Sequence, residues 1–357
     1  MTKTLSALGL LAALLLVVQR PCFSAGSESW QAPESPVIKR QAIEFWNAGT
    51  QLRGTLYWPV MAKARRVPVV VAFHDASVGM ADAPLYRHLR EGLPAMGIGV
   101  LLFDRRGSGK SGGSAKNVSY AMLADDGIAG ARAISTLSQI DPRHIGYWGL
   151  SQGGWLAILA ANRDKHAAFA VSVSAPLVTP EVQMEFAMAN RLRVLGCSQS
   201  DVSAMLDARR SWSAYLAGRG TRAAAIAKLS AIYRKPWFSQ MYLPSPDQVP
   251  SDPRASSWRT HMNVDPLPAL DAVRMPMLFI FGGADPWIPV DVTVRRLNAL
   301  SSRHPNLQWN IVPNASHEMM FVSPSRAMST DTNTDQVFPE APQYFMLLAS
   351  WLTRHAF

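Results

Sequence analysis

Cysteine is scarce in this sequence, and the compositional features of disordered, coiled-coil and collagen-like proteins are missing. Cys22 and Cys197 are the two cysteines among 357 residues, which excludes a disulfide-rich scaffold. Charged residues make up 17% of the chain and hydrophobic residues 48%, which excludes wholesale disorder and a coiled coil. There is no internal repeat, and proline and glycine follow no period, which excludes collagen-like and low-complexity chains. What remains is a globular protein of one large domain or two modest ones.

The positive charge of the chain comes from arginine. The net charge is +10, and 27 of the 35 basic residues are Arg. Such a balance is compatible with anionic neighbours, but no run of Lys and Arg exceeds two residues and no zinc-finger spacing occurs, so we predict no nucleic-acid function. The histidines form no H-x-x-x-H or H-E-x-x-H pair, and we predict neither a metal nor another cofactor.

The N-terminus carries an apolar run over residues 5–18, preceded by Lys3. Its 14 residues are too few to span a bilayer and are typical of the core of a signal peptide. Small residues at Cys22 and Ser24 favour cleavage after Ser24, with an uncleaved anchor as the alternative. Removal of residues 1–24 leaves a net charge of +8, no stable membrane span and Cys197 as the one remaining cysteine. We therefore expect an exported protein, periplasmic or secreted.

Short apolar segments alternate with helical ones along most of the chain. A polar lead-in at residues 25–40, expected to be flexible, precedes a predicted hairpin with strands at 41–46 and 51–58. Further strands are predicted at residues 67–73, 99–103, 145–149, 169–175, 277–281 and 307–312, and helices at 83–96, 118–137, 152–161 and about 344–354. This alternation predicts an α/β fold with a mostly parallel central sheet and flanking helices.

One long stretch, residues 177–266, interrupts the alternation. It is helical and rich in arginine at first and then rich in proline. We predict that it is a helical cap inserted into the main domain. The core then has a first part at residues 41–176 and a second part at 267–357.

A G-x-S-x-G motif at residues 149–153 follows a predicted strand and begins a predicted helix. A sharp strand-to-helix turn lifts the Ser151 hydroxyl above the sheet, and the two glycines allow neighbouring backbone to approach. The turn also leaves the Gln152 N–H at a helix N-terminus, where negative charge is favoured. This context predicts that Ser151 is a nucleophile.

A serine hydroxyl needs a base to take its proton, and that base needs an orienting acid. His317 follows the predicted strand at residues 307–312 and is the candidate base. Asp285 follows the predicted strand at 277–281 and is the candidate acid, whereas Asp291 is better explained as a helix cap.

The order Ser151, Asp285, His317 and the segment D-R-R-G-S-G-K-S at residues 104–111 resemble the α/β-hydrolase superfamily. Within it, the chain is similar to bacterial esterases and serine aminopeptidases, relatives of dienelactone-hydrolase and prolyl-oligopeptidase catalytic domains. The resemblance covers residues 41–176 and 263–357. It implies an oxyanion hole formed by the Gln152 N–H and an N–H of the loop after the strand at 67–73, which we carry over to Ala76.

Three segments invite other interpretations. The family usually has His-Gly where this chain has His74 and Asp75, and we interpret His74 as structural. The segment at residues 104–111 nearly matches a phosphate-binding loop, but an aspartate replaces the first glycine, so we interpret it as a structural turn. The neighbours Asp125 and Asp126 are expected on a solvated helix face.

The sequence thus predicts an exported serine hydrolase that cleaves a carboxylic ester through an acyl-enzyme. A peptidase or aminopeptidase of the same fold is the first alternative, with Glu181 and Glu185 of the cap as candidate ligands of a substrate amino group or, equally, as a solvated face. The second alternative is a catalytically silent binding protein. The expected partner is a small acyl ester or a short peptide, and the oligomeric state stays open.

Overall fold

The computed structural model describes residues 38–60, 66–76, 81–116, 118–321 and 341–357. The predicted signal peptide lies outside the described residues, as does most of the predicted lead-in. The strands are β1 (Ile38–Asn47), β2 (Thr50–Pro59), β3 (Val67–Phe73), β4 (Gly99–Phe103), β5 (Ile140–Leu150), β6 (Ala170–Val173), β7 (Met277–Gly282) and β8 (Leu307–Val312).

The α-helices are α1 (Leu93–Ala95), α2 (Tyr120–Ser135), α3 (Gln152–Arg163), α4 (Pro180–Val194), α5 (Gln199–Leu216), α6 (Arg222–Ile232), α7 (Trp258–His261), α8 (Leu267–Ala272), α9 (Val290–Ser301) and α10 (Pro342–His355). Single helical turns of other types are η1 (Pro84–Tyr86), η2 (His88–Gly92), η3 (Phe238–Gln240), η4 (Pro246–Gln248) and η5 (Pro253–Ala255).

The strands form one sheet of eight in the order β1-β2-β4-β3-β5-β6-β7-β8. The hairpin β1–β2 and the pair β2–β4 are antiparallel, and all other neighbours are parallel. At the hairpin turn, Ala48 and Gly49 both have a positive φ, as a tight two-residue hairpin turn requires. The mostly parallel sheet confirms the predicted fold class.

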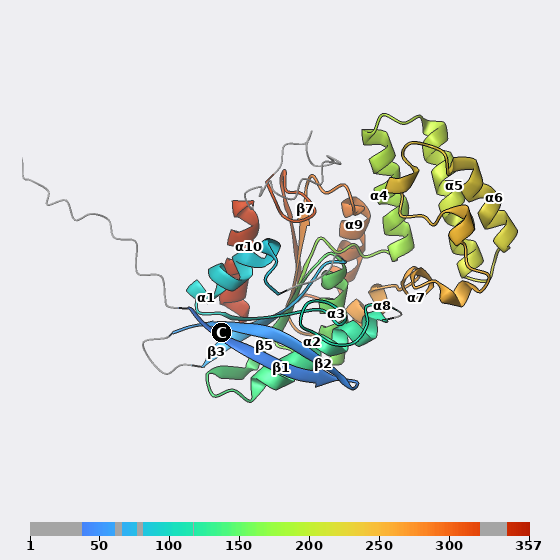
Figure 1. The fold of residues 1–357 in the computed structure, drawn as a ribbon. Helices are drawn as coiled ribbons and strands as arrows, with labels where there is room; N and C mark the ends of the chain where they lie inside the picture. Colours follow the sequence, from blue (N-terminus) through green and yellow to red (C-terminus); the bar gives the residue numbers. More distant parts are fainter. Residues whose placement is uncertain (1–37, 61–65, 77–80, 117, 322–340) are drawn as a thin grey trace, which may run out of the picture. The chain divides into compact units, whose positions relative to one another are not determined.

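Helices cover both faces of this sheet, because its central strands are apolar on both sides (Figure 1). Along β3, Val69 and Val71 pack into the cluster that includes α2, α3 and α9, whereas Val70 and Ala72 pack into the cluster that includes α10. Alternate residues of a strand point to opposite faces, so an unbroken apolar run supplies both cores. Each of these buried valines stabilises the fold by about 1.5–3 kcal/mol.

Helices α4 to α7 lie between β6 and β7 in the sequence and have an apolar core of their own (Figure 1). The N-termini of α4, α5 and α6 are capped by side chains: Thr179, Ser198 and Thr221 each accept a hydrogen bond from the third residue along. Such caps stabilise a helix by about 1 kcal/mol each. Trp287, from the loop after β7, packs against this core and against the core of the sheet.

Several element boundaries differ from the sequence-based predictions. Strand β1 begins at Ile38, inside the predicted lead-in, and β5 begins at Ile140 rather than at residue 145. The predicted helix at 83–96 was wrong: the segment is split into η1, η2 and α1. Pro94 explains the change between η2 and α1, because its missing N–H and its ring prevent a regular helix through that turn. Asp291 is not a cap either: it lies in the first turn of α9, whose N-cap is Pro289.

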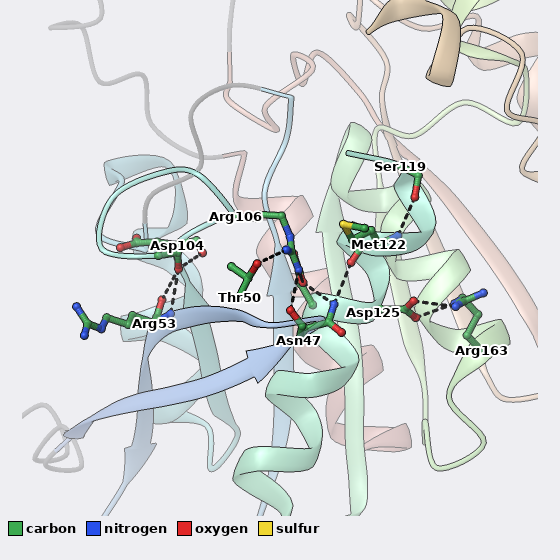
Figure 2. A network of polar contacts seen from close by, with 11 residues as sticks. Asn47, Thr50, Arg53, Asp104, Arg106, Ser119, Met122, Asp125 and Arg163 are labelled. Atoms are coloured by element: carbon green, nitrogen blue, oxygen red, sulfur yellow. Dashed lines mark hydrogen bonds and ion pairs between the residues drawn. The ribbon is translucent and has the colours of Figure 1, made fainter. Parts of the chain in front are cut away.

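The expectation of a solvated face at Asp125 and Asp126 was half wrong. Asp125 lies at the surface and forms an ion pair with Arg163 at 2.8 Å. Asp126 is buried, and its two oxygens accept hydrogen bonds from Arg106 at 2.5 and 3.1 Å. Arg106 also donates to the Thr50 hydroxyl at 2.5 Å, as Figure 2 shows. This ion pair therefore joins α2 to the β1–β2 hairpin and to the turn after β4.

Candidate active site

Ser151 lies at the sharp turn between β5 and α3, with φ 55° and ψ −118°. Non-glycine residues rarely adopt such a conformation, and it persists where the surrounding structure imposes it. Here the Ser151 N–H donates to Val173 O at 2.8 Å, which holds the turn against β6. The motif glycines are needed because a Cβ at Gly149 would overlap the Gly153 carbonyl, and a Cβ at Gly153 would overlap backbone of Phe73.

Asp285 and His317 follow two neighbouring strands, β7 and β8, on the loops at their carboxyl ends. His317 Nδ1 is 2.8 Å from Asp285 Oδ2, and the Asp285 side chain is completely buried. Backbone hydrogen bonds join the two loops: Gly283 N–H donates to Val312 O at 2.8 Å, and Ala284 N–H donates to Ala315 O at 3.0 Å. The structure thus brings together the two residues predicted as acid and base.

The electrostatics of His317 follow from this contact. Burial by itself would lower the pKa of the imidazole, but the adjacent Asp285 carboxylate and its hydrogen bond outweigh burial and raise the pKa to about 9. Glu318 and Asp75 add smaller contributions in the same direction. Asp285 therefore fixes the ring orientation and favours the imidazolium form.

Ser151 lies at the same edge of the sheet, because β5, β7 and β8 are parallel and β6 alone separates β5 from β7. Among the residues that the structure describes, the Ser151 hydroxyl makes no hydrogen bond to His317. The arrangement thus has a serine with a strained backbone at one loop and an oriented acid–base pair on two others.

The predicted oxyanion donors lie on two segments near Ser151. Gln152 begins α3, so its N–H has no partner within that helix. Ala76 is exposed and lies in the loop after β3, next to a part of the loop outside the described residues. Asp75 N–H faces the Tyr86 hydroxyl oxygen at 3.2 Å.

His74 is buried in this loop, with Nε2 2.6 Å from Phe103 O. Burial lowers its pKa to about 4, so the ring is neutral and is held against β4. This contact is the structural role that the sequence suggested for His74.

The segment at residues 104–111 contains two arginines with different positions. Arg106 forms the buried ion pair with Asp126. Arg105 instead lies beside Gln152, the residue after Ser151, and its Nη2 donates to Gln152 Oε1 at 2.5 Å. The sequence treated the whole segment as a structural turn and missed Arg105. The available signal was its position two residues after the end of β4, at the sheet edge that also carries Ser151.

The resemblance of this segment to a phosphate-binding loop has a structural explanation. Asp104 accepts hydrogen bonds from the N–H groups of Lys110 at 2.8 Å and Ala81 at 2.7 Å. Backbone N–H groups thus converge on Asp104 as they do on a phosphate, but here the Asp104 carboxylate already accepts their hydrogen bonds. Figure 2 shows Asp104 in this turn, next to Arg53.

The two acidic residues considered for a substrate amino group lie on α4 and are close to arginines of α5. Glu185 accepts two hydrogen bonds from Arg210, at 2.7 and 3.0 Å. Glu181 accepts from the Trp258 indole at 3.2 Å and lies 3.9 Å from Arg209. Burial raises the pKa of Glu181, although Arg209 opposes that effect. Its low exposure contradicts the alternative of a solvated face.

Within the described ranges no cluster of three or more His, Cys, Asp or Glu side chains has the geometry of a metal site. Over the same part of the chain, no helix has the length and apolarity needed to cross a bilayer. Cys197 is a half-buried free thiol that packs against the core of the cap.

A family model described as "Serine aminopeptidase, S33" matches residues 68–322. A polyketide transferase of Penicillium crustosum is 27% identical over 161 residues, which are 43% of this chain and 50% of that protein. The chain spans about half the length of the curated relatives it matches, or less.

Among solved structures, an esterase of Pyrococcus furiosus aligns with a TM-score of 0.54 at 17% identity, over 90% of this chain and 94% of that one. An acylaminoacyl peptidase of Pyrococcus horikoshii aligns with a TM-score of 0.56 at 15% identity, over 90% of this chain and 42% of that one. At these identities the likeness concerns the fold.

Proposed function

Because this chain belongs to the serine aminopeptidase S33 family of α/β hydrolases, we propose that it is a serine hydrolase that cleaves a carboxylic ester through an acyl-enzyme. The observation that carries the proposal is the 2.8 Å contact between His317 and the buried Asp285, at the same sheet edge as Ser151. A hydroxyl, an imidazole and an orienting carboxylate are the parts that acyl transfer requires.

In the proposed reaction, Ser151 Oγ attacks the acyl carbon while His317 Nε2 takes the hydroxyl proton. Asp285 holds the ring with Nδ1 protonated and stabilises the imidazolium, and the N–H groups of Gln152 and Ala76 receive the oxyanion. The tetrahedral species then expels the alcohol, to which His317 returns the proton. Water, deprotonated by the same imidazole, cleaves the acyl-enzyme to the free acid and regenerates Ser151.

A peptidase activity is the alternative that the family description and the acylaminoacyl peptidase fold favour. The contacts in the cap argue against its aminopeptidase form, since Glu185 is neutralised by Arg210 and Glu181 lies close to Arg209. An ester is also the easier substrate, because an alkoxide leaves more readily than an amine. A silent binding protein is the second alternative.

The first experiment treats residues 25–357 with a fluorophosphonate probe and maps the labelled peptide by mass spectrometry. We expect labelling of Ser151 alone, lost in Ser151→Ala and retained in Ser135→Ala, a serine at the end of α2 that bonds only its own helix. Hydrolysis of short aryl esters is then compared with that of aminoacyl amides. Folded protein without labelling at Ser151 would contradict the proposal and favour the silent binding protein.

We also propose that the chain is exported to the periplasm or beyond and that residues 1–24 are removed. The basis is the 14-residue apolar run behind Lys3. Full-length protein expressed in a bacterial host should appear in the exported fraction with Ala25 as its N-terminal residue. Deletion of residues 2–24 should keep it in the cytoplasm. An intact N-terminus on exported protein would instead support the uncleaved anchor.

A further inference from the structure

Arg105 lies between the two backbone segments that carry the proposed oxyanion donors. Its Nη2 donates to Asp75 O at 2.6 Å and to Gln152 Oε1 at 2.5 Å, with His74 O at 3.4 Å. One terminal nitrogen thus connects the loop after β3 to the first residue of α3. No other side chain in the described ranges has hydrogen bonds to both segments.

The carbonyl that Arg105 holds belongs to the peptide unit of the second donor. Asp75 C=O and Ala76 N–H are the two ends of one planar trans peptide, in which they point in opposite directions. A hydrogen bond that fixes the oxygen therefore also fixes the direction of the N–H. Because the donor is a guanidinium, the bond further polarises the peptide and strengthens Ala76 N–H as a donor.

Arg105 holds the second segment through the side chain of Gln152. Its Oε1 accepts from Arg105, and its Nε2 donates to the Tyr120 hydroxyl at 3.2 Å. Tyr120 in turn stacks on Trp155 of α3 and on His261 of the cap. The side-chain amide of Gln152 is therefore held from both sides, at the residue whose backbone N–H is the other proposed donor.

We propose that Arg105 is a positioning residue that aligns the two oxyanion donors, Ala76 N–H and Gln152 N–H. The inference rests on the proposed function and extends it to a residue that does not touch the substrate.

The test compares Arg105→Ala and Arg105→Lys with a matched control, Arg90→Ala. Arg90 is also partly buried and also donates to a backbone carbonyl, that of Ala83 at 2.8 Å, but it has no contact with Gln152 or Asp75. Loss of a single oxyanion donor lowers kcat by about 100- to 1000-fold in characterised enzymes. Since Arg105 acts through the donors, we expect kcat of Arg105→Ala to fall about 10- to 100-fold. KM should change less than about threefold, because the donors act on the transition state.

Two further readouts separate alignment of the donors from mere support of the fold. Methylguanidinium at millimolar concentration should restore part of the kcat of Arg105→Ala. It should not change the kcat of Arg90→Ala, which should match the wild type throughout. Affinity for a trifluoromethyl ketone, whose adduct with Ser151 carries an oxyanion, should fall by the same factor as kcat/KM. Near-ultraviolet circular dichroism monitors the fold of each variant.

The outcomes are distinguishable. An Arg105→Ala variant with wild-type kcat and wild-type affinity for the ketone would overturn this inference and leave the proposed function intact. A loss of activity that methylguanidinium fails to restore and that accompanies a changed circular dichroism spectrum would also overturn it, because the role would be structural. Wild-type protein that is neither labelled at Ser151 nor active on any ester would remove the proposed function and this inference together.

Discussion

The buried pair of Arg106 and Asp126 provides the sharpest test of how this fold is held together. The side chains are 6% and 1% exposed, so neither charge is solvated if its partner is removed. Arg106 donates to both carboxylate oxygens and, in addition, to Thr50 Oγ1 and Asn47 O. The change Arg106→Met keeps most of the side-chain volume and removes all of these donors, as can be followed in Figure 2.

Removal of one partner from a buried ion pair costs about 3–5 kcal/mol, because the other charge stays buried and uncompensated. Asp126 would keep one donor, Asn47 Nδ2 at 2.7 Å, which places the expected loss near the lower end, about 3 kcal/mol. The double change Arg106→Met with Asp126→Leu removes both charges. It should cost less than the sum of the single changes by about 2 kcal/mol.

Urea unfolding of residues 25–357, followed by circular dichroism, measures these differences as shifts of the midpoint at constant slope. The matched control is the exposed pair of Asp125, the neighbour of Asp126 on α2, and Arg163 of α3, whose side chains are 35% and 44% exposed. Asp125→Asn should cost less than about 1 kcal/mol, since water solvates the remaining charge. A loss below 1 kcal/mol for Arg106→Met, or strict additivity in the double variant, would refute this reasoning.

Three other predictions concern the candidate site. The kcat/KM for ester hydrolysis should rise with pH with a midpoint above about 6.5, because Asp285 raises the pKa of the catalytic imidazole, and Asp285→Asn should lower that midpoint. For the same reason the free energy of unfolding of the wild type should exceed that of His317→Gln in full below about pH 6.5, and this difference should vanish as the pH passes the raised pKa. A difference that grows with pH would contradict the prediction. Gly149→Ala should abolish labelling of Ser151 and lower the midpoint of urea unfolding, because the new methyl group overlaps the Gly153 carbonyl. Gly218→Ala is the control, because a Cβ at Gly218 meets no atom within 4 Å. This change should cost only about 1–2 kcal/mol, for the positive φ of Gly218. Equal losses at both glycines would exclude the overlap as the cause.

Local patterns in the sequence were sufficient for the fold class and for the position of Ser151. The run V-P-V-V-V-A-F at β3 is apolar at every residue, and this is typical of a strand covered on both faces. The turn at residues 149–153 carries its constraint within five residues, because only glycine allows the backbone to approach so closely there. Asp285 and His317 were predicted from their places after Ser151 in the chain, each on the loop that follows a late strand, and the structure brings the two together.

Tertiary structure alone decided the roles of neighbours that look equivalent in the sequence. Arg105 and Arg106 are adjacent, as are Asp125 and Asp126, yet one of each pair enters the buried contact between α2 and the hairpin. Successive helical residues point about 100° apart, so burial depends on what packs against that side of the helix. For Asp126 the packing partners include Asn47, 79 positions away. A local pattern contains no information about a contact at such a separation, and for that reason the buried ion pair and the contacts of Arg105 became visible only in the folded chain.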